Sequence, residues 1–273
     1  MLSVPQQSDM NGDGSRTEPF PVGRRTVVDA MRMAGRRNDV HGLVEFDVTE
    51  ARRRIDDAAD ATGTRTSFTA FLVHCLGRAV RDHPNVQRYL DWRGRLVGFE
   101  DVDVMVVVET TVDGEKLGVP RVLRRVNDRS LASVHREIRA AQRSRPSTGW
   151  SSLLSLSERL PGVVRRQFYR LPRWSPRLWK RVAGTVGVTS VGMFGSGGGW
   201  GVTPTNYPLQ LTVGGISEKP RYVDGELEPR EFLHLTVTVD HDVVDGAPAA
   251  RFVERLRELV EGAHGLELPA DES

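Results

Sequence analysis

A histidine ends an alternating apolar segment in the stretch LHLTVTVDHDVVDGAPAARFVERL, which runs from Leu233 to Leu256. Asp245 and Gly246 follow shortly after His241, and a helical pattern begins beyond them. A histidine at a strand end is rigidly held, and it can take a proton from a thiol or hydroxyl near neutral pH. The spacing leaves three interpretations open. In the first, His241 is a general base. In the second, His241 only ends the strand and Asp245 caps the helix. In the third, both residues bind a metal, although no further cluster of metal ligands stands out.

Two hydroxyl residues, Thr189 and Ser190, directly precede a glycine-rich segment in VTSVGMFGSGGGW. A hydroxyl at this place can donate a hydrogen bond to an oxyanion. The glycines either let an extended cofactor approach the backbone or form a flexible surface loop. The pattern is neither GxGxxG nor a Walker A motif, so it predicts no nucleotide site of those kinds.

Helices and strands must position these residues, and the sequence indicates a mixture of both. Thr49 is predicted to be an N-cap, Pro84 ends a buried helical pattern, and a Val-Asp-Gly turn predicts a hairpin. The glycine after Asp245 suits a tight turn, which a positive φ at Gly246 would allow. The expected helices cover 24–37, 49–63, 67–83, 130–144 and 247–265. Long strands cluster in the second half, and this order predicts a two-layer α/β sandwich in one domain.

A segment rich in arginine and tryptophan, about 145–181, separates the two halves of this pattern. Its prolines predict two or three short helices rather than one long helix. Three interpretations remain open for it: a helical excursion that packs on its own domain, a site for a partner or carrier protein with an acidic surface, or a membrane-surface helix. It also stands where it could cover one side of a substrate channel.

The totals limit the class of protein. The chain has 273 residues, a formal net charge of +2 and one cysteine, Cys75, in an apolar run that predicts an inert core thiol. We expect a disordered tail over 1–20, a catalytic domain over 21–265 and a second tail over 266–273. Neither a membrane span nor a signal peptide is evident, and the near-neutral charge does not predict a nucleic-acid partner. These features favour a reducing, cytoplasmic setting.

Several motifs together resemble one family. DHDVVDGAPAARFVERLRELV is similar to the HxxxDG signature of the catalytic domain of 2-oxoacid dehydrogenase acyltransferases. The preceding block from GTVGVTSVGMFG to LHLTVTVDH resembles the same domain piece by piece. SFTAFLVHCLGRAVRDHPNVQRYLD and LGVPRVLRRVNDRSLASVHREI resemble its buried helix and its Val-Pro strand with the next helix. The resemblance covers roughly residues 22–262.

The resemblance implies a chloramphenicol-acetyltransferase-like α/β sandwich that forms homotrimers, with a channel between neighbouring subunits. Coenzyme A would enter as a substrate from one side and the acyl-bearing thiol from the other, without a metal. His241 would be the general base, Thr189 would stabilise the oxyanion, and Asp245 would hold the loop and the histidine. Substrate-binding roles would fall to Ser190, the second candidate for the oxyanion, and to Gly192, Gly246 and Arg25. Arg25 would meet coenzyme A phosphates, and a solvated surface arginine is the alternative.

Two departures from the family pattern matter. Asp242 follows the histidine where the family usually has arginine, and an anion close to an imidazole weakens it as a base at neutral pH. The sequence shows no lipoyl domain and therefore no covalent lipoyl group on this chain. The acyl group is then expected on acyl-CoA or on a separate lipoyl or acyl-carrier protein. The competing hypothesis is a non-catalytic relative that serves as a trimeric scaffold or partner-binding module.

Overall fold

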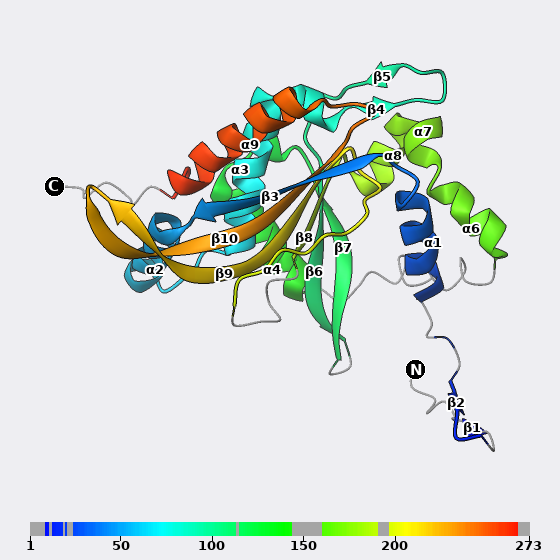
Figure 1. The fold of residues 1–273 in the computed structure, drawn as a ribbon, viewed down its shortest axis with the longest axis horizontal. Coiled ribbons are helices and arrows are strands. Elements are labelled where there is room, and N and C mark those ends of the chain that lie inside the picture. Colours follow the sequence, from blue (N-terminus) through cyan, green and yellow to red (C-terminus); the bar gives the residue numbers. More distant parts are fainter. Residues whose placement is uncertain are drawn as a thin grey trace.

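A mixed six-stranded sheet organises the chain (Figure 1). The computed structural model describes residues 9–10, 13–18, 20, 24–112, 115–143, 160–190 and 197–266. The strand order is β3-β10-β9-β8-β6-β7, in which β8 is parallel to both of its neighbours and every other pair is antiparallel. The strands are β3 (Asp39–Asp47), β6 (Val104–Val112), β7 (Glu115–Leu123), β8 (Val186–Ser190), β9 (Leu209–Val223) and β10 (Glu226–Asp240).

Helices pack on this sheet and give the predicted two-layer α/β sandwich (Figure 1). The main helices are α1 (Arg24–Ala34), α2 (Thr49–Thr62), α3 (Phe68–Asp82), α4 (Leu131–Arg143) and α9 (Gly246–Glu261). The minor elements are β1 (Asp9–Met10), β2 (Arg16–Thr17), β4 (Tyr89–Leu90), β5 (Leu96–Val97) and 3-10 turns at Pro84–Gln87 and Val126–Asp128. The sequence predicts no element in 1–20, whereas the structure pairs β1 with β2 there.

The alternation of β10 separates an apolar face of the sheet from a polar one. The residues that join the same buried cluster as α3 and α9 are Leu233, Leu235, Val237 and Val239. Their neighbours in the strand point to the opposite face and are also buried, although they are polar: His234, Thr236, Thr238 and Asp240. Because polar groups are buried only where something is gained, this second face is where chemistry or specific contacts belong.

Local signals place both α2 and α3 close to their predicted bounds, but the predicted cap of α2 is not found. The Ser67 side chain accepts a hydrogen bond from the backbone N–H of Ala70 at 3.4 Å, and Pro84 follows the helix end. Cys75 lies fully buried within α3, and burial raises the pKa of its thiol, as expected for an inert core residue. The prediction of Thr49 as an N-cap is wrong. Thr49 is the first residue of α2, and its hydroxyl accepts from the backbone N–H of Glu231 at 2.8 Å.

The strands β9 and β10 form a long hairpin with the predicted turn. Asp224 and Gly225 both have positive φ, 50° and 90°, as a tight hairpin turn requires. The register shifts between Leu233 and Leu235, opposite Gly214 and Gly215 in β9. This β-bulge re-aims the strands beside the polar face of the sheet.

The described part of the arginine- and tryptophan-rich segment packs on its own domain. Asp29 of α1 is 2% exposed and forms ion pairs with Arg165 at 2.8 Å and Arg166 at 3.3 Å. Within its described residues, 160–181, the segment forms short helices separated by prolines, as predicted: α6 (Gly162–Phe168), α7 (Leu171–Trp174) and α8 (Pro176–Ala183). It also contributes to a second buried cluster whose members include Tyr89, Tyr169, Trp179 and Tyr207. Burial raises the pKa of Tyr169 to about 12, with the Asp29 charge adding to the effect.

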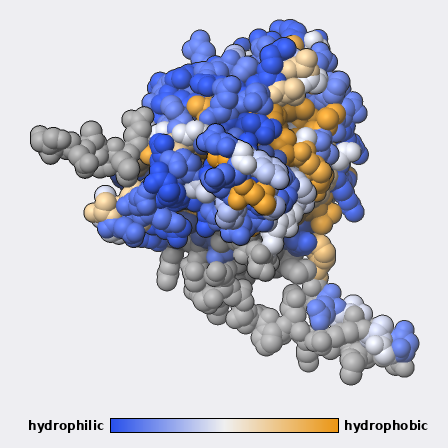
Figure 2. All heavy atoms as spheres, turned by 60° about the vertical axis from the view of Figure 1, so that its left-hand side comes forward, coloured by the Kyte–Doolittle hydropathy of each residue, from blue (hydrophilic) through white to orange (hydrophobic). Residues whose placement is uncertain are grey.

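The surface also carries apolar residues. Figure 2 shows them gathered mainly toward the right-hand side of that view. Exposed apolar side chains occur on α1, β3, α6 and α8, among them Met31, Leu43, Phe168 and Leu178. Such patches are typical of surfaces that contact other molecules. Within the described residues, no helix has the length and apolarity needed to cross a membrane.

Candidate functional site

The turn that carries His241 has a firmly held backbone and an exposed side chain. The His241 N–H donates to the Asn38 carbonyl at 2.9 Å, and the N–H groups of Val243 and Val244 both donate to the Asp240 carbonyl at 3.0 Å. Val244 is buried and fixes the turn to the core, whereas His241 is exposed. Within the described part of the chain, no hydrogen bond restrains the imidazole. The ring is therefore open to a second molecule.

Charged side chains surround this turn. Asp240 is buried and forms an ion pair with Arg37, and Arg37 also lies 3.7 Å from Asp39. Burial raises the pKa of Asp39, against the opposing effect of a hydrogen bond from the Thr205 backbone. Asp242, the departure from the family pattern, accepts a hydrogen bond from the Asn38 side-chain amide at 2.9 Å. The carboxylate of Asp242 is thus engaged by a neighbour rather than left without a contact.

Asp245 and Gly246 are placed differently from the expectation. Asp245 occupies the N-cap position of α9 with an extended backbone, but its side chain makes no capping hydrogen bond. Nor does its carboxylate contact His241 through any hydrogen bond among the described residues. Gly246 begins α9 without a positive φ, so the prediction of a positive-φ turn is wrong. A Cβ atom at Gly246 would meet no atom within 4 Å, which leaves this side of the turn open.

Thr189 and Ser190 lie on opposite faces of β8. Val186 and Val188 point into the main core, so alternation places Ser190 on the core side and Thr189 on the polar side. Thr189 pairs with Thr212 of β9, and Thr212 pairs with Thr236 of β10, which gives a row of three hydroxyls. Thr236 is fully buried, and its hydroxyl has no hydrogen-bond partner among the described residues. The polar face thus carries one hydroxyl group at the same level in each of three neighbouring strands.

One copy of the chain does not bring His241 and Thr189 together. The register places Thr189 of β8 level with Thr236 of β10, two strands away. Thr236 in turn precedes His241 by five residues. At roughly 3.3 Å per residue, the separation along the strand alone is on the order of 16 Å. A hydrogen bond or a shared substrate atom between the two residues of one copy is therefore impossible in this conformation.

The described end of the glycine-rich segment, from Gly197 to Trp200, packs closely on its own sheet. A Cβ atom on Gly198 would lie 2.2 Å from the His234 ring, and one on Gly214 would lie 2.1 Å from the Gly199 carbonyl oxygen. These glycines are therefore explained by contact with β9 and β10, which differs from both predicted roles. Gly192, predicted to bind substrate, lies outside the described residues.

Sequence reasoning missed a cluster of polar and charged side chains around the buried His234. The Nδ1 atom of His234 lies 3.1 Å from the Gly215 carbonyl oxygen, and its Nε2 atom lies 3.1 Å from a Glu45 carboxylate oxygen. Lys219 contacts Glu45 at 2.5 Å, and the Lys219 hydrogen bond is the main cause that lowers the pKa of Glu45. The Trp200 ring stands edge-on to His234 at 4.4 Å between centroids. No local pattern could reveal the cluster, because its members come from three strands and a loop.

A cavity of about 370 Å³ lies beside the His241 turn. Arg25, the predicted phosphate ligand, is exposed in the first turn of α1 and does not line it. Within the described residues, the Arg36 and Arg173 side chains form no ion pair or hydrogen bond, and Arg170 contacts only Gln167. The charged and aromatic lining includes Arg36, Arg37, Tyr169, Arg170, Arg173, Trp174, Asp240 and Asp242. The cavity therefore offers unpaired guanidinium groups and an aromatic ring to an anionic ligand.

The described residues contain no group of three or more His, Cys, Asp or Glu side chains arranged to hold a metal ion.

Comparisons with known proteins agree with this geometry. The family model described as 2-oxoacid dehydrogenases acyltransferase (catalytic domain) matches residues 12–148 and 181–268 and leaves out most of the arginine- and tryptophan-rich segment. A dihydrolipoyllysine-residue acetyltransferase component of the pyruvate dehydrogenase complex from Mycoplasma capricolum is 26% identical over 226 residues. That match covers 80% of this chain and 44% of the relative, so the chain spans less than half of that relative's length.

Solved structures show the same fold. A probable dihydrolipoamide acetyltransferase from Listeria monocytogenes has a TM-score of 0.67 at 18% identity, with 96% of this chain and 99% of that chain covered. Dihydrolipoamide acetyltransferase from Azotobacter vinelandii has a TM-score of 0.65 at 21% identity, with 98% and 100% covered. The two-layer sandwich expected from the sequence is thereby confirmed.

Proposed function

The chain belongs to the family of 2-oxoacid dehydrogenase acyltransferase catalytic domains, and we propose that it transfers an acyl group between coenzyme A and a thiol of the dihydrolipoyl type. The observation that carries this proposal is the state of His241, whose backbone is fixed by Asn38 while its ring is exposed. A base that must meet a thiol on a separate molecule needs both properties.

The proposed reaction exchanges one thioester for another. The His241 imidazole takes the proton of the attacking thiol while the sulfur bonds to the acyl carbonyl carbon. The carbonyl oxygen becomes an oxyanion, to which the Thr189 hydroxyl donates a hydrogen bond. When the intermediate collapses, the original carbon–sulfur bond breaks and the imidazolium returns its proton to the departing sulfur.

Residue spacing in the Azotobacter vinelandii enzyme supports these roles. Crystallographic and enzymatic investigations of that enzyme concern the role of a serine, a histidine and an asparagine in its catalytic mechanism. Its serine precedes its histidine by the same number of residues as Thr189 precedes His241, and its asparagine follows the histidine at the spacing of Asp245. We therefore place a hydroxyl at Thr189 in the oxyanion role and a polar side chain at Asp245 beside the site.

We further propose that the working site forms between two copies in a homotrimer. His241 and Thr189 are too far apart within one copy, so His241 of one copy would act with Thr189 of the next. The edge strand β3 carries Val40 and Leu43 with 46% and 54% of their surface exposed, which is apolar area that a neighbouring copy would cover.

The cavity beside His241 is the proposed place for the phosphate groups of coenzyme A. Arg36, Arg170 and Arg173 supply guanidinium groups without a carboxylate partner among the described residues, and Trp174 supplies an aromatic face. Arginine matches phosphate oxygens with paired hydrogen bonds. The acyl group would arrive as a free thioester or on a separate lipoyl or acyl-carrier protein.

Purified protein mixed with acetyl-CoA and dihydrolipoamide tests the proposal, with coenzyme A separated from acetyl-CoA by chromatography. The His241→Ala variant should lose a factor of about 10² to 10⁴ in kcat, the typical worth of a general base. The Ser190→Ala control, on the core side of the same strand, should stay within about threefold of wild type. A wild type no faster than His241→Ala, over acetyl-CoA and longer acyl-CoA substrates, would support the non-catalytic scaffold instead.

A further inference from the structure

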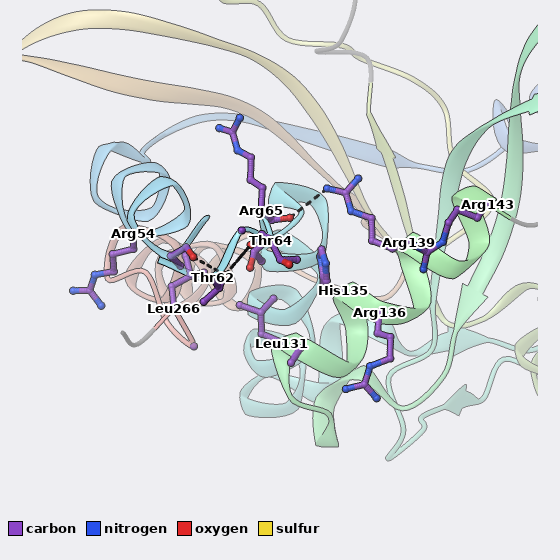
Figure 3. Close-up of a pocket in the computed structure, with 15 residues that line it drawn as sticks. Arg54, Thr62, Thr64, Arg65, Leu131, His135, Arg136, Arg139, Arg143 and Leu266 are labelled. Carbon is purple, nitrogen blue, oxygen red and sulfur yellow. Dashed lines mark hydrogen bonds between the residues drawn. The ribbon is translucent and has the colours of Figure 1, made fainter. Parts of the chain in front are cut away.

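A second and larger hollow lies away from the candidate site, between α2, α4 and the end of α9 (Figure 3). It is an open groove of about 720 Å³, and none of the residues predicted to act in catalysis lines it. Its basic lining consists of Arg54, Arg65, His135, Arg136, Arg139 and Arg143, without any aspartate or glutamate. Leu131, Leu266 and Ala58 add apolar surface. We call this hollow the arginine groove.

The α4 side of the arginine groove carries positive charge that carboxylates do not neutralise. Arg54 and Arg65 pair with Glu50 and Asp56, at 2.6 Å and 2.8 Å. In contrast, Arg139 bonds only to neutral oxygens within the residues that the structure describes, including the Arg65 carbonyl at 3.4 Å, which Figure 3 marks with a dashed line.

The other two arginines of α4 have no partner at all in the described part of the chain. Neither Arg136 nor Arg143 forms a hydrogen bond or ion pair through its side chain there, and both are exposed. At about 1.5 Å per residue, the strip of positive charge from Arg136 to Arg143 is about 10 Å long.

His135 adds a neutral donor to this strip. Its Nδ1 accepts a hydrogen bond from the Ser67 N–H at 2.9 Å, so the proton of the neutral ring sits on Nε2. Burial, helped by the Arg139 charge, lowers the pKa of His135 and keeps the ring neutral at pH 7. The groove therefore combines cationic and neutral donors over an apolar floor.

We propose that the arginine groove binds an acidic peptide segment of a partner protein. Arginines bind carboxylates through charge-assisted hydrogen bonds, and three residues of extended peptide, at about 3.3 Å each, span the strip on α4. The apolar floor suits leucine-like side chains between the acids. The lining has no phenylalanine, tyrosine or tryptophan on which a nucleobase could stack, and a net charge of +2 gives no extended field for nucleic acid.

Fluorescence anisotropy with a labelled hexapeptide, Glu-Leu-Glu-Glu-Leu-Glu, tests this inference at low salt. The double variant Arg136→Glu with Arg143→Glu should bind at least about tenfold more weakly than wild type, because two attractive charges become repulsive. The control is Arg177→Glu with Arg181→Glu, which makes the same charge change at two exposed arginines of α8 and should stay within about threefold. Acyl transfer should be equal in all three proteins, so failure here is distinguishable from failure of the proposed reaction.

Four results would overturn the proposal. The interaction is excluded if wild-type protein does not bind the hexapeptide at millimolar concentration. It is also excluded if the α8 control variant loses as much hexapeptide affinity as the α4 variant. Tighter binding of oligothymidylate than of the hexapeptide would assign the groove to nucleic acid. Residues 267–273 include Glu267, Asp271 and Glu272. If the hexapeptide binds only after these residues are deleted, the arginine groove would be assigned to the chain's own acidic end.

Discussion

The side-chain amide of Asn38 donates a hydrogen bond to the carboxylate of Asp242 at 2.9 Å. The same asparagine accepts the N–H of His241 through its carbonyl, also at 2.9 Å. One residue thus fixes the backbone of the proposed base and engages the anion that follows it in sequence. The aspartate that looked incompatible with catalysis has a partner of its own, and Asn38 becomes the residue on which its position depends.

Variants at Asn38 and Asp242 should separate the effect of the Asn38 hydrogen bond from the effect of the negative charge on Asp242. Asp242→Asn removes the charge but keeps the acceptor for Asn38, so we expect kcat within about threefold of wild type. Asn38→Ala releases the Asp242 carboxylate and should lower kcat about tenfold, because an unrestrained anion can approach the imidazole. The double variant should recover most of that loss, which steady-state kinetics would measure as a coupling between the two sites. An inactive Asp242→Asn variant would instead give the carboxylate a direct role in the reaction.

Complementation between two inactive variants should reveal the shared site. His241→Ala and Thr189→Ala each remove one half of it, so each homotrimer alone should be nearly inactive. If His241 acts with Thr189 of the neighbour, random mixing at equal amounts leaves about a quarter of the sites with both residues intact. Co-expression with two affinity tags, followed by the acetyl-CoA assay, should then recover about a quarter of wild-type activity. Mixed assemblies without any recovery would place both residues in the same copy.

A methyl group at Gly198 should destabilise the fold, whereas one at Gly197 should not. The Gly198 Cβ would lie 2.2 Å from the His234 ring, but a Cβ at Gly197 would meet no atom within 4 Å. Overpacking of this kind costs about 1–3 kcal/mol. Denaturant unfolding should show the loss for Gly198→Ala only, and His234→Ala in the same chain should relieve much of it. Equal stability of the two glycine variants would show that the loop moves away from the ring without cost.

Stability should decrease as the pH falls below neutrality because of His74. Burial lowers its pKa to about 4, with Arg78 and His264 adding to the effect. Since the unfolded imidazole titrates near 6.5, the unfolded chain binds the proton first, and stability is lost progressively between about pH 6.5 and about pH 4. The full difference corresponds to about 3 kcal/mol in the free energy of unfolding.

Denaturant titrations across this pH range would measure the effect. His74→Gln should flatten the dependence by most of that amount. A slope that survives His74→Gln would assign the acid sensitivity to other groups.

Local patterns predicted the parts of the fold that local forces decide. The opening of α3 near Ser67, the stop at Pro84 and the Asp224–Gly225 turn each involve residues a few positions apart. Thr49 shows the limit of this approach, because a donor from β10, distant in sequence, uses the hydroxyl that a local cap would need. Helix bounds and the hairpin therefore followed from sequence, whereas the hydrogen bonds between distant strands did not.

The candidate site shows the same division. Spacing and family resemblance proposed His241 and Thr189 as candidates, and strand alternation then separated Thr189 from Ser190 once the core-facing residues were known. The arginines beside His241 were not predicted, because Arg36 and Arg173 meet only when the segment after α6 folds back on α1. The cluster around His234 remained hidden for the same reason. Proximity between distant segments depends on register and packing, which a single sequence does not display.

The distance between His241 and Thr189 along the sheet has a consequence for how the protein must be handled. If each copy holds only half of a working site, dilution below the dissociation constant of the assembly yields folded protein without turnover. Specific activity would then rise with enzyme concentration and level off, while circular dichroism stayed constant throughout. A dilute preparation would look like an inactive homologue, although concentrating it would be enough to restore its turnover.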